Sequence, residues 1–187
     1  AALVESLTNG RGRSIDVSML ESTLASMGWV VSNYLNAGVV PLPMGNENFT
    51  AAPSGTFRTA EGLLNIAANE NIQYEKLCDV IGRPDLKTDV RFEDRETRRQ
   101  NRQAINAEIA PELMKRTAAE WEQTLIEVGV PTGRVLSVPE ILGHPHLSGR
   151  NFVSEFEGSA GKQVVTRGGF LFSGGQTSPP GPAPALS

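Results

Sequence analysis

The first apolar residues of the chain recur at helical spacing. Leu3, Val4 and Leu7 would lie on one face of a helix. The run from Thr8 to Gly10 is typical of a helix C-terminus, where glycine takes the left-handed conformation. No capping residue precedes this pattern, so we expect the chain to begin inside a helix.

A short alternating segment and a longer helical pattern follow. Residues 14–17 (Ser-Ile-Asp-Val) predict a β-strand, and Ser18 with Glu21 forms a capping box that opens a helix extending toward Gly38. Helix, strand and helix in this order make half of an α/β unit. The strand would need a parallel neighbour supplied through a crossover, and no segment before it provides one. We therefore expect its partner sheet to be missing from this chain.

The helix predicted from about Met19 to Asn36 has one apolar face. Its members recur at spacings of three and four: Leu20, Leu24, Met27, Val31 and Leu35. Pro41 and Pro43 then exclude a helix, and the small and polar residues up to Gly55 predict a long loop. Long loops often carry function.

The middle of the chain combines a hairpin with several helices. Residues 55–59 and 63–68 alternate like strands, and Gly62 lies between them at the expected turn. The helices are predicted from apolar spacing and capping residues: Tyr74 to Ile81 ending at Gly82, Asp94 to Leu113 with Pro111 as a possible interruption, and Thr117 to Val128 ending at Gly129. These elements predict a small α+β domain.

The C-terminal part is less regular. Residues 130–136 predict a strand or an extended segment, and residues 138–142 predict a short helical turn. Residues 152–156 and 163–166 could form a second hairpin. Nine of the twenty residues 168–187 are Gly or Pro, which predicts an extended or disordered tail.

Composition restricts the partners. The chain has 17 Lys and Arg residues and 21 Asp and Glu residues. The resulting net charge of −4 argues against nonspecific nucleic-acid binding. No apolar run approaches the roughly 20 residues that cross a bilayer, so no membrane partner is expected. Hydrophobic residues make up 39% of the chain, which is enough for a folded core.

Cysteine and histidine usage predicts no disulfide and no metal site. Cys78 is the single cysteine, which favours a reducing, cytoplasmic setting. It lies on the apolar face of its predicted helix, so a buried structural thiol is favoured over a nucleophile. His144 and His146 flank a proline, and no nearby carboxylate or cysteine completes a metal-ligand set.

Five short segments along nearly the whole chain form a specific combination. They are residues 10–21 (GRGRSIDVSMLE), 55–59 (GTFRT) followed by Gly62, 81–86 (IGRPDL), 129–133 (GVPTG), and 139–142 (PEIL) with His144 and Pro145. Each segment is weak alone, but in this order and spacing they resemble the class III coenzyme A transferases, the family of formyl-CoA transferase that also contains α-methylacyl-CoA racemases.

The resemblance implies a division of the chain and a set of partners. Family members are about twice as long, with a large α/β domain, a smaller α+β domain, a C-terminal segment that returns to the large domain, and an interlocked homodimer. We therefore expect residues 1–40 to be the helix–strand–helix remnant of the large domain, 41–136 the small α+β domain with antiparallel hairpins, and 137–187 the return segment. The expected partners are a second copy or the missing N-terminal domain, and an acyl-CoA thioester as substrate.

The resemblance also implies a nucleophile that this chain lacks. The family uses an aspartate that forms anhydride and thioester intermediates, because an acyl anhydride is reactive enough to be opened by a thiolate. That aspartate would lie upstream of Ala1, so we expect no catalytic residue here and no activity of the chain alone. Asp16 matches a strand position beside the capping Ser18 and is not the nucleophile.

A family loop that folds over the active site matches the segment that begins with Gly45, Asn46, Glu47 and Asn48. Gly45 and Asn46 fit the family pattern, but bulkier residues replace the remaining glycines through Ala51. The loop is therefore expected to be stiffer, and the acyl substrate cannot be carried over from the formyl or oxalyl chemistry of the family. An ordinary connector is the alternative interpretation.

Two basic segments remain. Arg91, Arg95, Arg98, Arg99 and Arg102 cluster near the start of a helix, where the helix dipole disfavours positive charge. A solvated face with local ion pairs is favoured, and docking against another domain or a phosphate of coenzyme A is the alternative. Residues 10–13 (GRGR) resemble a phosphate cradle, but a tight turn explains them better because they follow a helix and precede a strand.

Three functions stay open from the sequence. The first is the C-terminal portion of a transferase that moves coenzyme A between carboxylic acids. The second is a racemase of the same family, whose acid and base would also lie largely upstream. The third is a free-standing binding or assembly module, in which self-association covers the exposed face left by the absent sheet.

Overall fold

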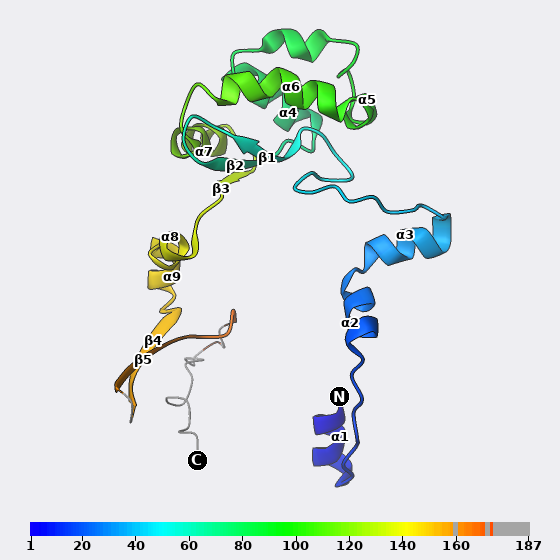
Figure 1. Cartoon of the computed structure of the whole chain (residues 1–187), viewed down its shortest axis with the longest axis vertical. Helices are drawn as coiled ribbons and strands as arrows, with labels where there is room; N and C mark the ends of the chain where they lie inside the picture. Colours follow the sequence, from blue (N-terminus) through cyan, green and yellow to red (C-terminus); the bar gives the residue numbers. More distant parts are fainter. Residues whose placement is uncertain (159–160, 171–172, 174–187) are drawn as a thin grey trace. The chain divides into compact units, whose positions relative to one another are not determined.

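The computed structural model describes residues 1–158, 161–170 and 173 of the chain, and it divides into two compact units, residues 1–45 and 46–187 (Figure 1). The first unit contains α1 (Ala2–Asn9), α2 (Met19–Ser26) and α3 (Trp29–Ala37). Gly10 ends α1 in the left-handed conformation, and Ser18 Oγ accepts a hydrogen bond from the Glu21 N–H at the start of α2. Both predicted helix boundaries are confirmed.

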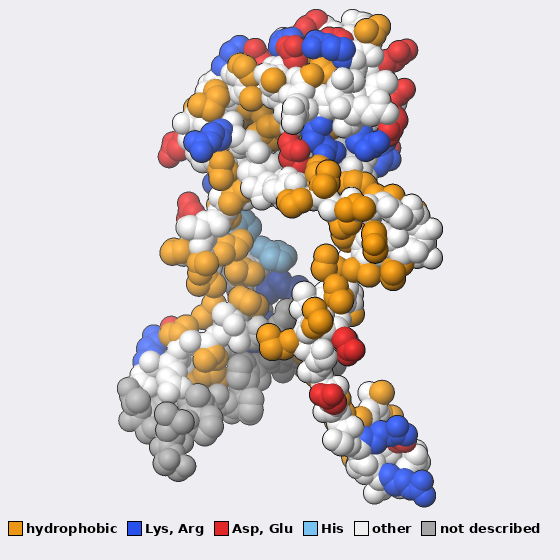
Figure 2. Space-filling view, turned by 45° about the vertical axis from the view of Figure 1, so that its right-hand side comes forward, with side chains coloured by type: hydrophobic (Ala, Val, Ile, Leu, Met, Phe, Trp, Pro, Cys, Tyr) orange, Lys and Arg blue, Asp and Glu red, His pale blue; other side chains and the backbone are white. Residues whose placement is uncertain are grey.

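Two predictions in the first unit are wrong. Residues 14–17 form no strand, because a strand needs a hydrogen-bonded neighbour and the described part of this unit contains none. The single helix predicted over residues 19–36 is divided into α2 and α3 at Gly28, whose φ is +47°. The predicted apolar face remains exposed, with Leu20 70% and Leu35 74% accessible, and Figure 2 shows hydrophobic side chains over much of α2 and α3.

An antiparallel sheet organises the second unit. Strands β1 (Ser54–Arg58), β2 (Leu63–Ala67) and β3 (Thr132–Arg134) lie in the order β1-β2-β3. The predicted hairpin is confirmed, with Thr56 opposite Asn65, and Gly62 has a φ of +86° at its turn. The third strand comes from the predicted extended segment and pairs Asn65 with Gly133.

Helices cover this sheet and enclose the core. They are α4 (Asn71–Val80), the 3₁₀ helix η1 (Pro84–Thr88), α5 (Arg95–Gln100), α6 (Arg102–Leu113) and α7 (Ala118–Glu127). Helix α6 contacts β1, and α7 contacts β2 and β3. The core includes predicted apolar positions that are fully buried: Leu64, Leu77, Ile105, Ile109, Leu113 and Leu125. The α+β fold class is thereby confirmed.

The helix predicted from Asp94 to Leu113 is interrupted, but not at its proline. Asn101 leaves the helical conformation between α5 and α6, with φ −96° and ψ +27°. Pro111 lies in the last turn of α6, which continues to Leu113. A proline near a helix C-terminus removes one backbone hydrogen bond without ending the helix at that point.

The remaining elements are α8 (Val138–Leu142), α9 (Pro145–Gly149), β4 (Val153–Gly158) and β5 (Gly161–Thr166). Strands β4 and β5 form the second predicted hairpin, with Phe156 opposite Gln163. The extended or disordered tail predicted for residues 168–187 falls almost entirely outside the described residues.

Candidate functional site

The loop that the sequence matches to the family's active-site loop has a defined conformation. Gly45 has a φ of +59° at its start, which glycine adopts without strain. The Asn48 N–H donates to the Ser54 carbonyl at 3.0 Å, and the Asn48 side-chain oxygen accepts from the Thr50 N–H at 2.8 Å. The segment of Ala51 to Ser54 is buried. Residues 45–48 therefore begin a segment whose far end is built into the core.

Arg102 of α6 holds the middle of this loop. Its side chain donates to the carbonyls of Asn48, Phe49 and Ala51 at 2.5, 3.4 and 3.3 Å. Arg102 is only 9% exposed. A buried guanidinium that donates to several carbonyls ties together the backbone of the loop, because one side chain binds three successive parts of it. This supports the expectation of a stiffer loop.

The start of the loop contacts the same helix. Glu47 accepts a hydrogen bond from Asn106 at 3.1 Å and lies 3.8 Å from the Arg102 guanidinium. Gly55 faces the loop from β1, and a Cβ added there would lie 2.9 Å from the Asn46 carbonyl oxygen. The start of the loop thus packs against the backbone of β1 and also contacts α6.

The arginine group is not simply the solvated face that was predicted. Arg98 is 1% exposed and donates to the Phe92 carbonyl at 3.0 Å and to the Asn71 side chain at 2.5 Å. Its guanidinium carbon lies 4.3 Å from the centre of the Tyr74 ring, in cation–π geometry. Arg98 and Arg102 are therefore buried structural residues: their terminal N–H groups donate to protein oxygens, whereas the Nε of each is buried without a hydrogen-bond partner.

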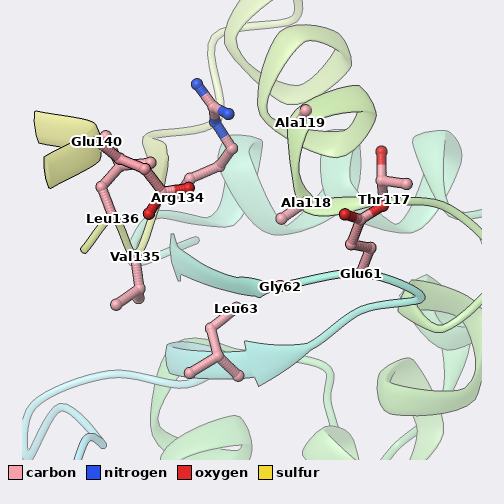
Figure 3. Close-up of a pocket in the computed structure, with 10 residues that line it drawn as sticks. All are labelled: Glu61, Gly62, Leu63, Thr117, Ala118, Ala119, Arg134, Val135, Leu136 and Glu140. Carbon is pink, nitrogen blue, oxygen red and sulfur yellow. The ribbon is translucent and has the colours of Figure 1, made fainter. Parts of the chain in front are cut away.

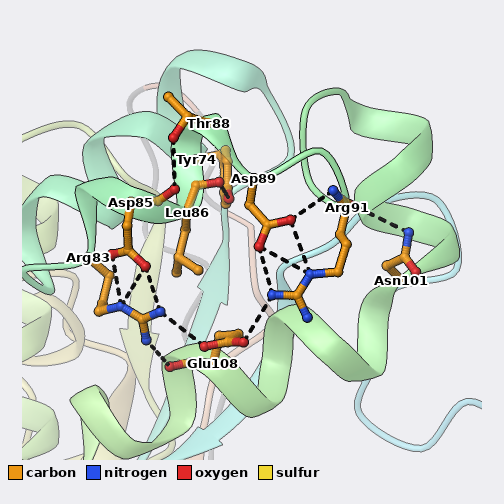
Figure 4. A network of polar contacts seen from close by, with 9 residues as sticks. All are labelled: Tyr74, Arg83, Asp85, Leu86, Thr88, Asp89, Arg91, Asn101 and Glu108. Carbon is orange, nitrogen blue, oxygen red and sulfur yellow. Dashed lines mark hydrogen bonds and ion pairs between the residues drawn. The ribbon is translucent and has the colours of Figure 1, made fainter.

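Of the other arginines in the predicted cluster, Arg99 pairs locally with Glu96, and Arg91 belongs to a network that also contains Arg83, which lies outside the cluster. Arg91 contacts Asp89 at 2.7 Å and Glu108 at 3.2 Å, and Arg83 contacts Asp85 and Glu108 (Figure 4). Glu108 on α6 joins both arginines, which connects the segment around η1 to this helix. The residues of the IGRPDL motif therefore have a structural role here.

This network predicts a pH-dependent stability. Hydrogen bonds from Arg83 and Arg91 hold the pKa values of Asp85, Asp89 and Glu108 below their ordinary range. A carboxylate with a lowered pKa in the folded state contributes stability above its unfolded pKa of about 4, and that contribution is lost as the pH falls through the folded pKa. We expect the free energy of unfolding to fall below about pH 4. Urea titrations from pH 6 to pH 2 measure it.

The matched variants Arg83→Gln and Arg91→Gln remove the cations from the same network. In each variant the free energy of unfolding should fall less steeply as the pH is lowered, because the pKa values of the carboxyl groups in the folded state then lie closer to those in the unfolded state. A pH profile identical to that of the unmodified protein would contradict the assigned role of the network.

Cys78 and Tyr74 form a buried pair beside Arg98. Burial raises the pKa of the Cys78 thiol to about 11, and burial likewise raises the pKa of Tyr74. The Tyr74 hydroxyl donates to the Leu86 carbonyl at 2.8 Å. A thiol that is 0% exposed and protonated at neutral pH does not act as a nucleophile, so the structure supports the packing role predicted for Cys78.

Two of the hollows on the described surface of the second unit are lined by charged residues. One has a volume of about 240 Å³, with Arg134 and Glu140 on one side and Glu61 and Thr117 on the other (Figure 3). Arg134 is already bound to Glu122 at 2.7 Å. The second hollow, of about 460 Å³, adjoins the loop and is lined by Phe49, Thr50, Arg95, Glu96 and Arg99.

The remaining candidates are not brought together. The Nδ1 atom of His144 accepts the His146 N–H at 3.2 Å, which makes it a helix cap. Among the described residues, no group of three or more His, Cys, Asp or Glu side chains is placed to hold a metal ion. Asp16 is exposed on the strand-free segment of the first unit. No helix among the described residues is both long and apolar enough to cross a bilayer.

A family model described as CoA-transferase family III matches residues 1–187. The chain belongs to this family. It is 33% identical over 153 residues to acetyl-CoA:oxalate CoA-transferase from Acetobacter aceti, covering 82% of the chain and 39% of that relative. It is 31% identical over 179 residues to succinyl-CoA:mesaconate CoA-transferase from Haloarcula marismortui, covering 95% of the chain and 44% of that relative.

The solved structures agree with this assignment. A CAIB/BAIF family protein from Brucella suis matches with a TM-score of 0.84 and 25% identity, covering 98% of the chain and 48% of that protein. Rv3272 from Mycobacterium tuberculosis matches with a TM-score of 0.79 and 26% identity, covering 95% of the chain and 46% of that protein. This family III chain therefore spans somewhat less than half the length of the relatives it matches.

Proposed function

We propose that this chain is the C-terminal portion of a class III transferase that moves coenzyme A between carboxylic acids. The family match over residues 1–187 carries the proposal. Several relatives are named as coenzyme A transferases for oxalate, D-citramalate, mesaconate or glutarate. These acids all carry two carboxyl groups, so we infer a dicarboxylic acid as one substrate.

In this proposal the nucleophilic aspartate lies upstream of Ala1. Its carboxylate attacks the thioester carbonyl of acyl-CoA and releases the coenzyme A thiolate, which leaves an acyl anhydride. The thiolate attacks the aspartyl carbonyl of the anhydride, giving an aspartyl thioester and the free acid. The acceptor acid then takes the acyl role in the reverse sequence, and each step replaces one acyl bond by another.

The loop that begins with Gly45, Asn46, Glu47 and Asn48 would cover the acyl intermediates. An anhydride is hydrolysed when water reaches it, so a cover over the reacting groups protects the transfer. Arg102 and Asn106 fix the loop from α6, which supports a stable cover rather than a freely moving one. Arg102 is in this role a positioning residue.

The wider organisation is part of the same proposal. Residues 1–40 would belong to a large α/β domain, 41–136 to the small domain, and 137–187 to a segment that returns to the large domain. The exposed apolar residues of α2 and α3 support a covering partner, for which we propose the missing domain or a second copy in a homodimer. The single buried cysteine supports a reducing, cytoplasmic location.

An exchange assay tests the placement of the nucleophile. Labelled dicarboxylic acid and an acyl-CoA are incubated either with the isolated 187-residue chain or with the protein that includes the upstream sequence, and mass spectrometry follows the labelled thioester. We expect transfer only with the longer protein. Turnover by the isolated chain would overturn the upstream placement of the aspartate.

The alternatives make different predictions in the same samples. A racemase would exchange the α-hydrogen of an acyl-CoA with deuterium from solvent and would transfer no coenzyme A to a free acid. A binding or assembly module would do neither, and sedimentation would show self-association of the isolated chain. The names of the relatives favour transfer over both alternatives.

A further inference from the structure

The GTFRT motif begins with a glycine that lies directly against the start of the loop. Gly55 is the second residue of β1, and a Cβ built on it would lie 2.9 Å from the Asn46 carbonyl oxygen and 3.4 Å from the Glu47 Cα. The first distance is about half an ångström shorter than ordinary van der Waals contact. Both neighbours are backbone atoms, which cannot rotate away as the end of a long side chain can. A side chain at position 55 would therefore displace the start of the loop.

The start of the loop is also held by other contacts, so it cannot be displaced freely. The Asn48 N–H donates to the carbonyl of Ser54 at 3.0 Å, which ties the loop to the first residue of β1. Glu47 accepts a hydrogen bond from Asn106 of α6 at 3.1 Å. Moving this backbone away from β1 would strain or break at least one of these hydrogen bonds, because they bind it from two different elements.

The close contact distinguishes Gly55 from another glycine of the same sheet. Gly133 of β3 pairs with Asn65 of β2, just as Gly55 of β1 pairs with Ile66 of β2. A Cβ built on Gly133 meets nothing within 4 Å. A strand of this sheet therefore accepts a methyl group at one glycine position, whereas at the other the loop occupies the space.

We propose that Gly55 is a positioning residue for the transfer reaction, because its missing side chain lets the start of the loop lie against β1 and cover the acyl intermediates. This inference rests on the proposed function and adds the residue that sets the position of the cover. A methyl group at position 55 would lift Asn46 and Glu47 and admit water to the reacting groups.

The side reaction that the cover prevents is hydrolysis of the aspartyl thioester. The oxygen of a water molecule attacks the thioester carbonyl, and the new C–O bond replaces the C–S bond. Coenzyme A leaves as the free thiol, the aspartate carboxylate is regenerated, and one proton is released. Transfer to an acceptor acid yields a new thioester and no free thiol, so the two outcomes are measured separately.

The ratio of free thiol to labelled thioester, measured in the protein that includes the upstream sequence, tests this role. Gly55→Ala is expected to raise this ratio about tenfold or more, since a misplacement of about 1 Å can change a rate by about a hundredfold. Gly133→Ala is the matched control and should leave the ratio unchanged. A variant that is only less stable would lose transfer and hydrolysis together, which does not move the ratio.

Asn106→Ala is a second variant that leaves β1 unaltered and decides the test if Gly55→Ala does not fold. It releases Glu47 from α6 and is expected to raise the same ratio. The Asn106 side chain is partly exposed, and its Oδ1 is buried without a hydrogen-bond partner. Its truncation therefore leaves no donor unpaired on this side of the amide, and the fold should be retained.

Hydrogen exchange of the isolated 187-residue chain separates this inference from the proposed function. Peptides covering residues 46–50 should exchange faster in Gly55→Ala than in Gly133→Ala, because the Asn48 N–H then loses its hydrogen bond to Ser54. Unchanged exchange in Gly55→Ala, or an unchanged thiol-to-thioester ratio in Gly55→Ala and Asn106→Ala, overturns the positioning role and leaves the transferase proposal intact. No transfer by the unmodified longer protein overturns the proposed function and this role with it.

Discussion

Replacing Arg98 with alanine is expected to lower the free energy of unfolding by about 3–5 kcal/mol. The change removes one of the largest fully buried side chains and leaves the Phe92 carbonyl and the Asn71 side chain without their donor. It also removes the cation–π contact with Tyr74. Urea denaturation followed by tryptophan fluorescence measures the effect, since Trp121 lies in the same core.

Arg99→Ala is the neighbouring control for this prediction. Arg99 is a partly exposed side chain whose contacts are to Glu96, so its removal should cost less than about 1 kcal/mol. Equal losses for Arg98→Ala and Arg99→Ala would show that burial does not decide the contribution of these arginines.

Replacing Arg102 with alanine is expected to release the loop and to lower the free energy of unfolding by about 2–4 kcal/mol. The carbonyls of Asn48, Phe49 and Ala51 lose their shared donor, and the buried Ala51 carbonyl has poor access to water. Hydrogen exchange measured by mass spectrometry should accelerate in peptides that cover residues 46–55. Peptides from α7 should change much less.

Two further variants sharpen the Arg102 experiment. Gln103→Ala changes the adjacent exposed position of α6 and should leave loop exchange unaltered. Arg102→Lys keeps the charge but cannot reproduce the planar donor geometry, so it should recover only part of the protection. Full protection of residues 46–55 in Arg102→Ala would refute the role assigned to this side chain.

Local signals in the sequence were sufficient to predict most helix and turn boundaries of the second unit. The Thr117–Glu120 capping box, the Gly62 turn and the glycine stops at Gly82 and Gly129 all predict boundaries that the structure has. These signals work because each boundary is decided by nearby backbone groups. The third strand, residues 132–134, lies in the segment predicted as a strand or an extended piece, but its pairing with β2 is a long-range contact that local signals do not predict.

The errors have identifiable physical causes. Residues 14–17 have strand propensity but no hydrogen-bonded neighbour in their unit, and propensity alone does not form a strand. The helix breaks at Gly28, where φ is positive. The apolar spacing continues across this residue, so it gave no sign of the break. Hydrophobic periodicity reports which residues share a face and does not report a local change of backbone conformation.

The candidate site was predictable as a segment but not as a set of contacts. The resemblance led to residues 45–48, whereas Arg102 and Asn106, which anchor them, lie more than fifty residues later in the chain. One signal was present, because positive charge at the start of a helix suggested a partner beyond that helix. The identity of that partner, the carbonyl oxygens of the loop, depends on the folded arrangement.

Because Cys78 is buried, its reaction with a thiol reagent can be used to measure how often the core opens. A protonated thiol on α4 that has no exposed surface and lies in the core reacts with an alkylating reagent only when the surrounding core opens. Because the chain has one cysteine, a single mass increment counts the opened molecules directly. The labelling rate would rank the variants discussed above in dilute, native buffer, without denaturant.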